Sequence, residues 1–190
     1  MPIALAVVFG LCAVAMIGIM VYFSCIDTET DLGSFERIIR FNDIWGTHRG
    51  FMWIRSIWIF GDASFIEKLF GVGPDMFYSA FSPYFDDLSK YGDSSTNAAH
   101  NEYLNYLITI GITGLLSYLA IVCGTIKNAV KYAKENPMLI ACVSAVICYA
   151  VQSVVNLYQP ITTPLFFIFI ALCEAFVRNA KAEKSAVSAV

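Results

Sequence analysis

Two histidines and two arginines carry most of the chemistry that this sequence could perform. His48 and His100 are its only histidines, and Arg49 and Arg55 lie on an aromatic-rich run. An imidazole can accept a proton near neutral pH, and a guanidinium can bind two diphosphate oxygens with its planar fork. Each also has an ordinary explanation. A lone histidine at a helix start is usually a surface or capping residue, and an interfacial arginine usually extends its charge to lipid headgroups.

His100 lies where the sequence predicts the start of a helix. Asn97 is predicted as the N-cap, which would place His100 and Asn101 in the first helical turn. The unpaired N–H groups and partial positive charge of a helix N-terminus favour phosphate binding. The same field disfavours the imidazolium, so His100 is expected to stay neutral and able to accept a proton.

The other reactive side chains point to no further site. Six cysteines lie at positions 12, 25, 123, 142, 148 and 173, and all but Cys25 fall within or at the edge of apolar stretches. Thiols pack there as small hydrophobic groups, and their spacing predicts neither a metal site nor a disulfide framework. The turn at residues 71–74 lacks the spacing of a nucleotide-binding loop, and the adjacent Asp86 and Asp87 are interpreted as solvated.

Four apolar stretches and one large polar segment must position these residues. Charged residues make up 14% of the chain, against roughly 25% in a soluble domain. Because the charges crowd between the apolar stretches, we expect an all-α polytopic membrane protein with about four transmembrane helices. The predicted parts are a first span at 1–24, a large loop at 25–102, three spans within 103–177 and a tail at 178–190. The second to fourth spans are expected at about 103–126, 138–156 and 162–177.

The basic residues predict the orientation of these spans. Lys127, Lys131 and Lys134 lie between the second and third spans, and Arg178, Lys181 and Lys184 follow the fourth. Lys and Arg in short loops are retained in the cytoplasm, so both segments are expected there. The large loop, with six basic and twelve acidic residues, is then extracytoplasmic. Its aromatic run 51–60 is too short to span and is predicted to be an interfacial or re-entrant helix.

The order of these features resembles the O-antigen ligase and polymerase superfamily. The matching residues are Arg49 followed by Trp53, the turn Leu69-Phe70-Gly71-Val72-Gly73, the segment His100-Asn101-Glu102-Tyr103-Leu104, and Gly111-Ile112-Thr113-Gly114. The resemblance covers about residues 45–175. Family members usually have more spans and a longer chain, so the sequence resembles their C-terminal part and suggests a truncated gene or a split subunit.

The resemblance implies a metal-independent glycosyltransferase, without a cofactor, at the outer face of the cell membrane. Such enzymes transfer or polymerise undecaprenyl-diphosphate-linked glycans in cell-surface polysaccharide assembly. By motif position, Arg49 would hold the donor diphosphate and His100 would orient or deprotonate the acceptor hydroxyl. Asn101 and Arg55 are further substrate-binding candidates. The expected partners are the lipid bilayer, the carrier-linked donor, the glycan acceptor and another membrane subunit supplying missing spans, but not nucleic acid.

Two other functions stay open on the sequence alone. A transporter of small anions would use polar residues such as Gln152, Asn156 and Gln159, near the outer end of the third span. Against this, no charged residue lies in the middle of a span, where ion pathways usually carry one. A non-catalytic subunit would only pair with a partner membrane protein.

Overall fold

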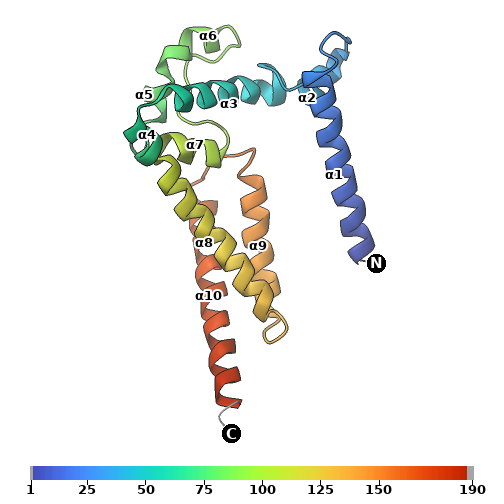
Figure 1. The fold of residues 1–190 in the computed structure, drawn as a ribbon, viewed down its shortest axis with the longest axis vertical. Coiled ribbons are helices and arrows are strands. Elements are labelled where there is room, and N and C mark those ends of the chain that lie inside the picture. Colours follow the sequence, from blue (N-terminus) through green and yellow to red (C-terminus); the bar gives the residue numbers. More distant parts are fainter. Residues whose placement is uncertain (1, 188–190) are drawn as a thin grey trace.

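The computed structural model of the protein describes residues 2–187, and most of them are helical, which confirms the all-α fold class. The elements are α1 (Pro2–Cys25), η1 (Gly33–Phe35), α2 (Glu36–Ile39), α3 (Trp45–Asp62), α4 (Phe65–Phe70), α5 (Phe77–Phe81), η2 (Ser82–Tyr84), α6 (Phe85–Ser89), α7 (Glu102–Thr109), α8 (Gly111–Tyr132), α9 (Met138–Gln152) and α10 (Thr162–Val187). Helices α8, α9 and α10 lie together, α3 runs crosswise near their upper end, and α1 stands apart beyond the other end of α3 (Figure 1).

Helices α8, α9 and α10 pack on one another through two apolar clusters. The first contains Tyr118, Val122, Val146 and Phe166, and the second contains Ala129, Leu139, Cys142, Val143, Cys173 and Val177. Two of the six cysteines are therefore buried here as small hydrophobic side chains. At the end of this group farthest from α3, Lys184 Nζ lies 3.6 Å from Glu135 Oε1. The α8–α9 connection and the end of α10 therefore lie at the same end of the molecule.

The stretches predicted as spans are largely helical, but their bounds differ, and the third, expected at 138–156, ends as the helix α9 at Gln152. The first span is the single helix α1, but the stretch 103–126, expected as one helix, is divided into α7 and α8. The fourth continues as α10 to Val187, so most of the predicted tail is helical, and residues 188–190 lie outside the described part. Among the described residues, only Gly111–Tyr132 is both long and apolar enough to cross a membrane, and the apolar helices Gly10–Cys25 and Met138–Gln152 are shorter.

The division between α7 and α8 follows from a close backbone contact. Gly111 has φ +69°, a left-handed conformation that favours glycine, and a Cβ there would overlap the carbonyl oxygen of Leu69. Val72 N donates to Ile108 O (2.9 Å), and Gly73 N donates to Thr109 O (3.0 Å). The glycines at 71–73 and 111 thus allow the turn after α4 to pack directly on the end of α7.

Helices α3, α5 and α6 lie above the three-helix group in Figure 1, and they share a small apolar core with α7. Phe51 and Met52 of α3 pack there with Phe77, Phe81, Leu88, Ala99 and Ile108. The predicted helix 51–60 is the second half of α3, whose Ile57 and Trp58 remain about half exposed. An amphipathic helix of this kind suits the surface of a bilayer.

Candidate functional site

An unusual left-handed turn places Arg49 at the start of the right-handed part of α3. Gly46, Thr47 and His48 have φ of 58°, 61° and 68°. Such a conformation costs a non-glycine residue about 1–2 kcal/mol, and it persists only where the surroundings enforce it. One such constraint is the close packing of the Gly50 backbone on Asn42. A Cβ at position 50 would overlap the carbonyl oxygen of Asn42, so only glycine fits there.

The guanidinium of Arg49 is only partly used by the protein. Its Nη1 donates to the carbonyl oxygen of Gly46 at 2.9 Å, which closes the left-handed turn. Its Nε is buried and has no hydrogen-bond partner among the described residues. A buried, unpaired donor on a charged group is costly, so Arg49 has capacity left for an anionic ligand.

His100 lies just before α7 rather than within it. Asn101 is the N-cap, because its Oδ1 accepts a hydrogen bond from Leu104 N at 3.0 Å, and the predicted cap at Asn97 is therefore wrong. His100 itself has φ +51°. It remains next to the partial positive charge of a helix N-terminus, as the sequence predicted.

A polar pocket of about 340 Å³ contains His100 and the residues that precede it. Met52 of α3 lines it together with Asp93, Thr96, Asn97 and His100. Thr96 Oγ1 also lies 3.7 Å from the sulfur of Met52, which links the loop to α3.

Arg49 precedes Met52 by one helical turn, so both lie on the same side of α3. Its positive charge acts on the imidazole: burial and Arg49 hold the pKa of His100 below its ordinary value, while Asp93 opposes the shift. Arg49 does not line this pocket, but it is near enough for its charge to act on His100, and burial and that charge both favour the neutral imidazole.

Arg55, by contrast, is engaged within the protein. It forms an ion pair with Asp43, and its guanidinium carbon lies 4.0 Å from the centre of the Phe51 ring and 4.9 Å from that of Trp58. Tyr91 OH donates to the same Asp43 at 3.3 Å. These contacts anchor the segment before α3. Like Arg49, Arg55 has a buried Nε without a hydrogen-bond partner among the described residues, but its ion pair with Asp43 leaves its charge less available to a substrate.

Two further residues, His48 and Glu102, stand close to the candidates. His48 packs its ring 4.8 Å from that of Tyr91, and its buried Nδ1 has no partner in the described part of the chain. Glu102 is only 1% exposed. Its carboxylate accepts hydrogen bonds from Tyr106 OH and Ser153 Oγ, both at 2.8 Å.

Glu102 also fixes the start of α7 to the end of α9. Its backbone N donates to the carbonyl oxygen of Ser153 at 2.9 Å, and Ser153 is itself only 3% exposed. Because Glu102 follows His100 by two residues, this buried link helps to set the position of the imidazole. In the sequence, the only indication of this link is an acidic residue two positions after a histidine, because the partner Ser153 lies 51 residues away.

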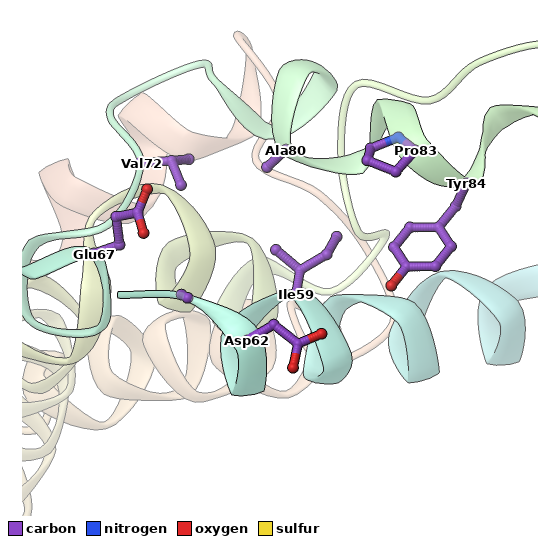
Figure 2. A pocket seen from close by; sticks show the side chains of 8 residues that line it. Ile59, Asp62, Glu67, Val72, Ala80, Pro83 and Tyr84 are labelled. Atoms are coloured by element: carbon purple, nitrogen blue, oxygen red, sulfur yellow. The ribbon is translucent and has the colours of Figure 1, made fainter. Parts of the chain in front are cut away.

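Another pocket, of about 310 Å³, lies between the end of α3 and the segment 80–84. Figure 2 shows Tyr84 extending toward α3, near Ile59 and Asp62, with Glu67 on the opposite side beside Val72. The carboxylate of Glu67 is already used as a capping box with Ser64. None of the eight lining residues is a histidine, lysine or arginine, so this pocket does not match the chemistry predicted from the sequence.

The arrangement at Arg49 and His100 combines two chemical functions. A partly unpaired guanidinium can bind an anion and stabilise charge on it, and a neutral imidazole can accept a proton. Across residues 2–187, no group of three or more histidine, cysteine, aspartate or glutamate side chains could hold a metal ion.

Comparison with known proteins gives a family match that includes Arg49 and His100. A family model described as O-antigen ligase matches residues 2–119, which include α1, the whole polar segment, α7 and the start of α8. No curated protein and no solved structure matches the chain.

Proposed function

Because the chain belongs to the O-antigen ligase family, we propose that it is a membrane glycosyltransferase of cell-surface polysaccharide assembly. Its donor is a glycan linked to undecaprenyl diphosphate. The acceptor is a sugar hydroxyl, on a second carrier-linked glycan for a polymerase or on a lipid-anchored core sugar for a ligase. Membrane location and a function in O-antigen ligation or polymerisation follow from the family itself, and the donor chemistry is the proposal.

One observation supports this proposal: the charge of Arg49 acts on His100 although the two residues are 51 positions apart in the sequence. Arg49 has an unused buried donor, and its charge helps to keep His100 neutral. An anion-binding group beside a proton acceptor is what transfer from a diphosphate carrier requires, because the leaving group is anionic and the attacking hydroxyl must lose a proton.

In the proposed step, the acceptor hydroxyl oxygen forms a bond to the anomeric carbon of the donor sugar. The bond from that carbon to the diphosphate oxygen breaks, and its electron pair stays on the diphosphate. Arg49 stabilises this charge through its guanidinium, and the proton of the hydroxyl passes to His100. Asn101 holds α7 in place beside them through its N-cap and is a candidate contact to the substrate, as is Arg55.

The same proposal assigns four spans, formed by α1, α7 with α8, α9, and α10, with residues 25–102 outside the cell. The ion pair between Lys184 and Glu135 supports it, because both predicted cytoplasmic segments lie at one end of the helices. The amphipathic α3 then lies along the outer surface of the bilayer, where its exposed Trp58 meets the headgroups.

A transfer assay tests the proposed roles in membranes of the source cells from which the native gene has been deleted. Variants are expressed there, and the product is measured with a synthetic polyprenyl-diphosphate glycan. We expect His100→Ala to lower turnover about 100-fold or more, the usual contribution of a positioned proton acceptor. Arg49→Lys should lose most of the activity, because an ammonium lacks the planar fork.

Arg37→Lys is the matched control, because Arg37 is exposed on α2, and it should retain full activity. His100→Gln separates orientation from proton transfer, since an amide can hydrogen-bond the acceptor but cannot accept a proton at neutral pH. If His100→Ala and Arg49→Lys both keep wild-type turnover, the catalytic roles are wrong, and an anion transporter or a structural subunit becomes the better explanation.

A further inference from the structure

A third pocket, beside α7, is lined by none of the residues predicted to form a site. Its volume is about 310 Å³, and three segments line it: the turn after α4, the helix α7, and the region where α10 begins. Pro74 and Asp75 come from the turn, Asn105 and Tyr106 from α7, and Tyr158 from the α9–α10 connection. A volume of this size is at the lower end of known ligand pockets, which span roughly 300–1,000 Å³.

Asn105 is the unexplained group in this pocket. The residue is only 5% exposed, and its side-chain oxygen Oδ1 is buried with no hydrogen-bond partner within residues 2–187. The backbone oxygen of the same residue is occupied, because Thr109 Oγ1 donates to it at 2.7 Å. Buried amide oxygens in native proteins are nearly always paired, so a ligand that donates a hydrogen bond would satisfy Asn105.

Asp75 and Tyr158 join two sides of the pocket. Tyr158 OH donates to Asp75 Oδ1 at 3.1 Å, across 83 residues of sequence. Asp75 is held in a left-handed conformation, with φ +60°, which a residue other than glycine adopts only where its surroundings require it. The hydrogen bond leaves the carboxylate able to accept further donors.

The charge of the pocket selects the class of ligand. Its lining residues include one carboxylate and no lysine, arginine or histidine. A phosphate or other anion would be repelled by Asp75 and would find no cation. A neutral ligand rich in hydroxyl or amide N–H groups fits the acceptors, and the rings of Tyr106 and Tyr158 offer apolar faces.

We propose that this pocket binds one uncharged sugar ring of the glycan, whose hydroxyl or acetamido N–H groups donate to Asn105 and Asp75. The C–H face of the ring packs on Tyr158. This inference rests on the proposed function and adds a sugar-binding subsite to it. Asn105 lies five residues after His100, so α7 connects this subsite to the site that binds the diphosphate.

The test uses the full chain in phosphatidylcholine nanodiscs, free of detergents with sugar headgroups. Saturation-transfer NMR measures the binding of N-acetylglucosamine, methyl galactoside and glucuronate. We expect the neutral sugars to bind and glucuronate to bind at least about tenfold more weakly, because its carboxylate meets Asp75. Asn105→Leu keeps a similar volume but removes the amide, and it should weaken neutral-sugar binding about tenfold, the scale of one lost hydrogen bond.

Two further variants complete the test. Tyr158→Phe keeps the ring but removes the hydrogen bond to Asp75, and it should also weaken binding. It provides an independent readout if Asn105→Leu unfolds, as judged by its thermal melting. Asp62→Asn, in the pocket of Figure 2, is the control and should bind sugars as the wild type does.

The outcomes separate this inference from the proposed function. If no neutral sugar binds, if glucuronate binds equally well, or if neither Asn105→Leu nor Tyr158→Phe weakens binding, the pocket holds only water and the inference is wrong. Glycan transfer that depends on His100 would then still support the proposed function. If sugars bind through Asn105 but the wild type transfers no glycan, the subsite stands and the glycosyltransferase proposal is wrong.

Discussion

Replacing Gly111 by alanine would force a methyl group into the backbone of the turn after α4. The new Cβ would overlap the carbonyl oxygen of Leu69 and lie 2.6 Å from the amide nitrogen of Gly71. Neither group can move alone, because Val72 N and Gly73 N are hydrogen-bonded to the end of α7. The residue would also have to keep φ near +69°, which L-amino acids rarely adopt.

The expected loss of stability has two parts. The left-handed conformation costs a non-glycine residue about 1–2 kcal/mol, and an extra methyl group in a packed contact costs about 1–3 kcal/mol. Together they lower the free energy of unfolding by about 2–5 kcal/mol. For a chain of this size, each kcal/mol shifts the melting temperature by roughly 2–4 °C, so a decrease of roughly 4–20 °C is expected for Gly111→Ala.

Gly124→Ala provides a matched control in the same helix. Gly124 lies in α8, and a Cβ there would meet no described atom within 4 Å. Since alanine favours the helix over glycine by about 0.5–1 kcal/mol, this variant should melt at or above the wild-type temperature. Melting is followed by circular dichroism in nanodiscs. If both variants melt at the same temperature, the contact between the turn and α7 does not stabilise the fold as described.

Three other predictions concern proton transfer, orientation and the buried carboxylate. Because burial and Arg49 lower the pKa of His100, kcat/KM should fall only below about pH 6.5, as the imidazole gains a proton, and His100→Gln should flatten this acid limb; a loss centred above pH 7 would contradict the assignment. A membrane-impermeant thiol reagent should label Cys25 in intact cells, whereas a cysteine introduced at Lys131 should react only after permeabilisation, and labelling of position 131 in intact cells would reverse the topology. Glu102→Gln would point an amide N–H₂ group at the hydroxyl of Tyr106 or of Ser153, each of which donates to the carboxylate in the wild type. We therefore expect the free energy of unfolding to fall by about 1–3 kcal/mol, measured by thermal unfolding. An unchanged melting temperature would mean that these hydrogen bonds are not formed.

The parts of the fold that depend on local composition could be predicted from the sequence. Helices α1, α9 and α10 follow from apolar runs, which are visible without knowledge of their neighbours. The break at Gly111 could not be predicted in this way, since glycine is tolerated within membrane helices. Its left-handed conformation arises from contact with Leu69, 42 residues earlier.

The same distinction between local sequence and tertiary contact applies to the candidate site. The roles of Arg49 and His100 are predicted from their place in a motif, but the effect of the Arg49 charge on His100 depends on how α3 packs against the loop before α7. Asn97 and Asn101 are equally good caps by residue type. The buried link of Glu102 to Ser153 favours Asn101, because it fixes where the helix begins. The ion pair of Arg55 with Asp43 is likewise a tertiary contact, which the aromatic run alone does not reveal.

In the proposed topology, the link between Glu102 and Ser153 makes the height of His100 above the lipid depend on α9. His100 is two residues from a backbone that is hydrogen-bonded to the end of that helix, whereas Arg49 belongs to α3, which runs crosswise over the helix group (Figure 1). A thinner or thicker bilayer would move α9 and the surface helix by different amounts. In the proposed enzyme, the spacing between imidazole and guanidinium would then change with acyl-chain length, and the rate of the proposed glycan transfer would depend on the lipid.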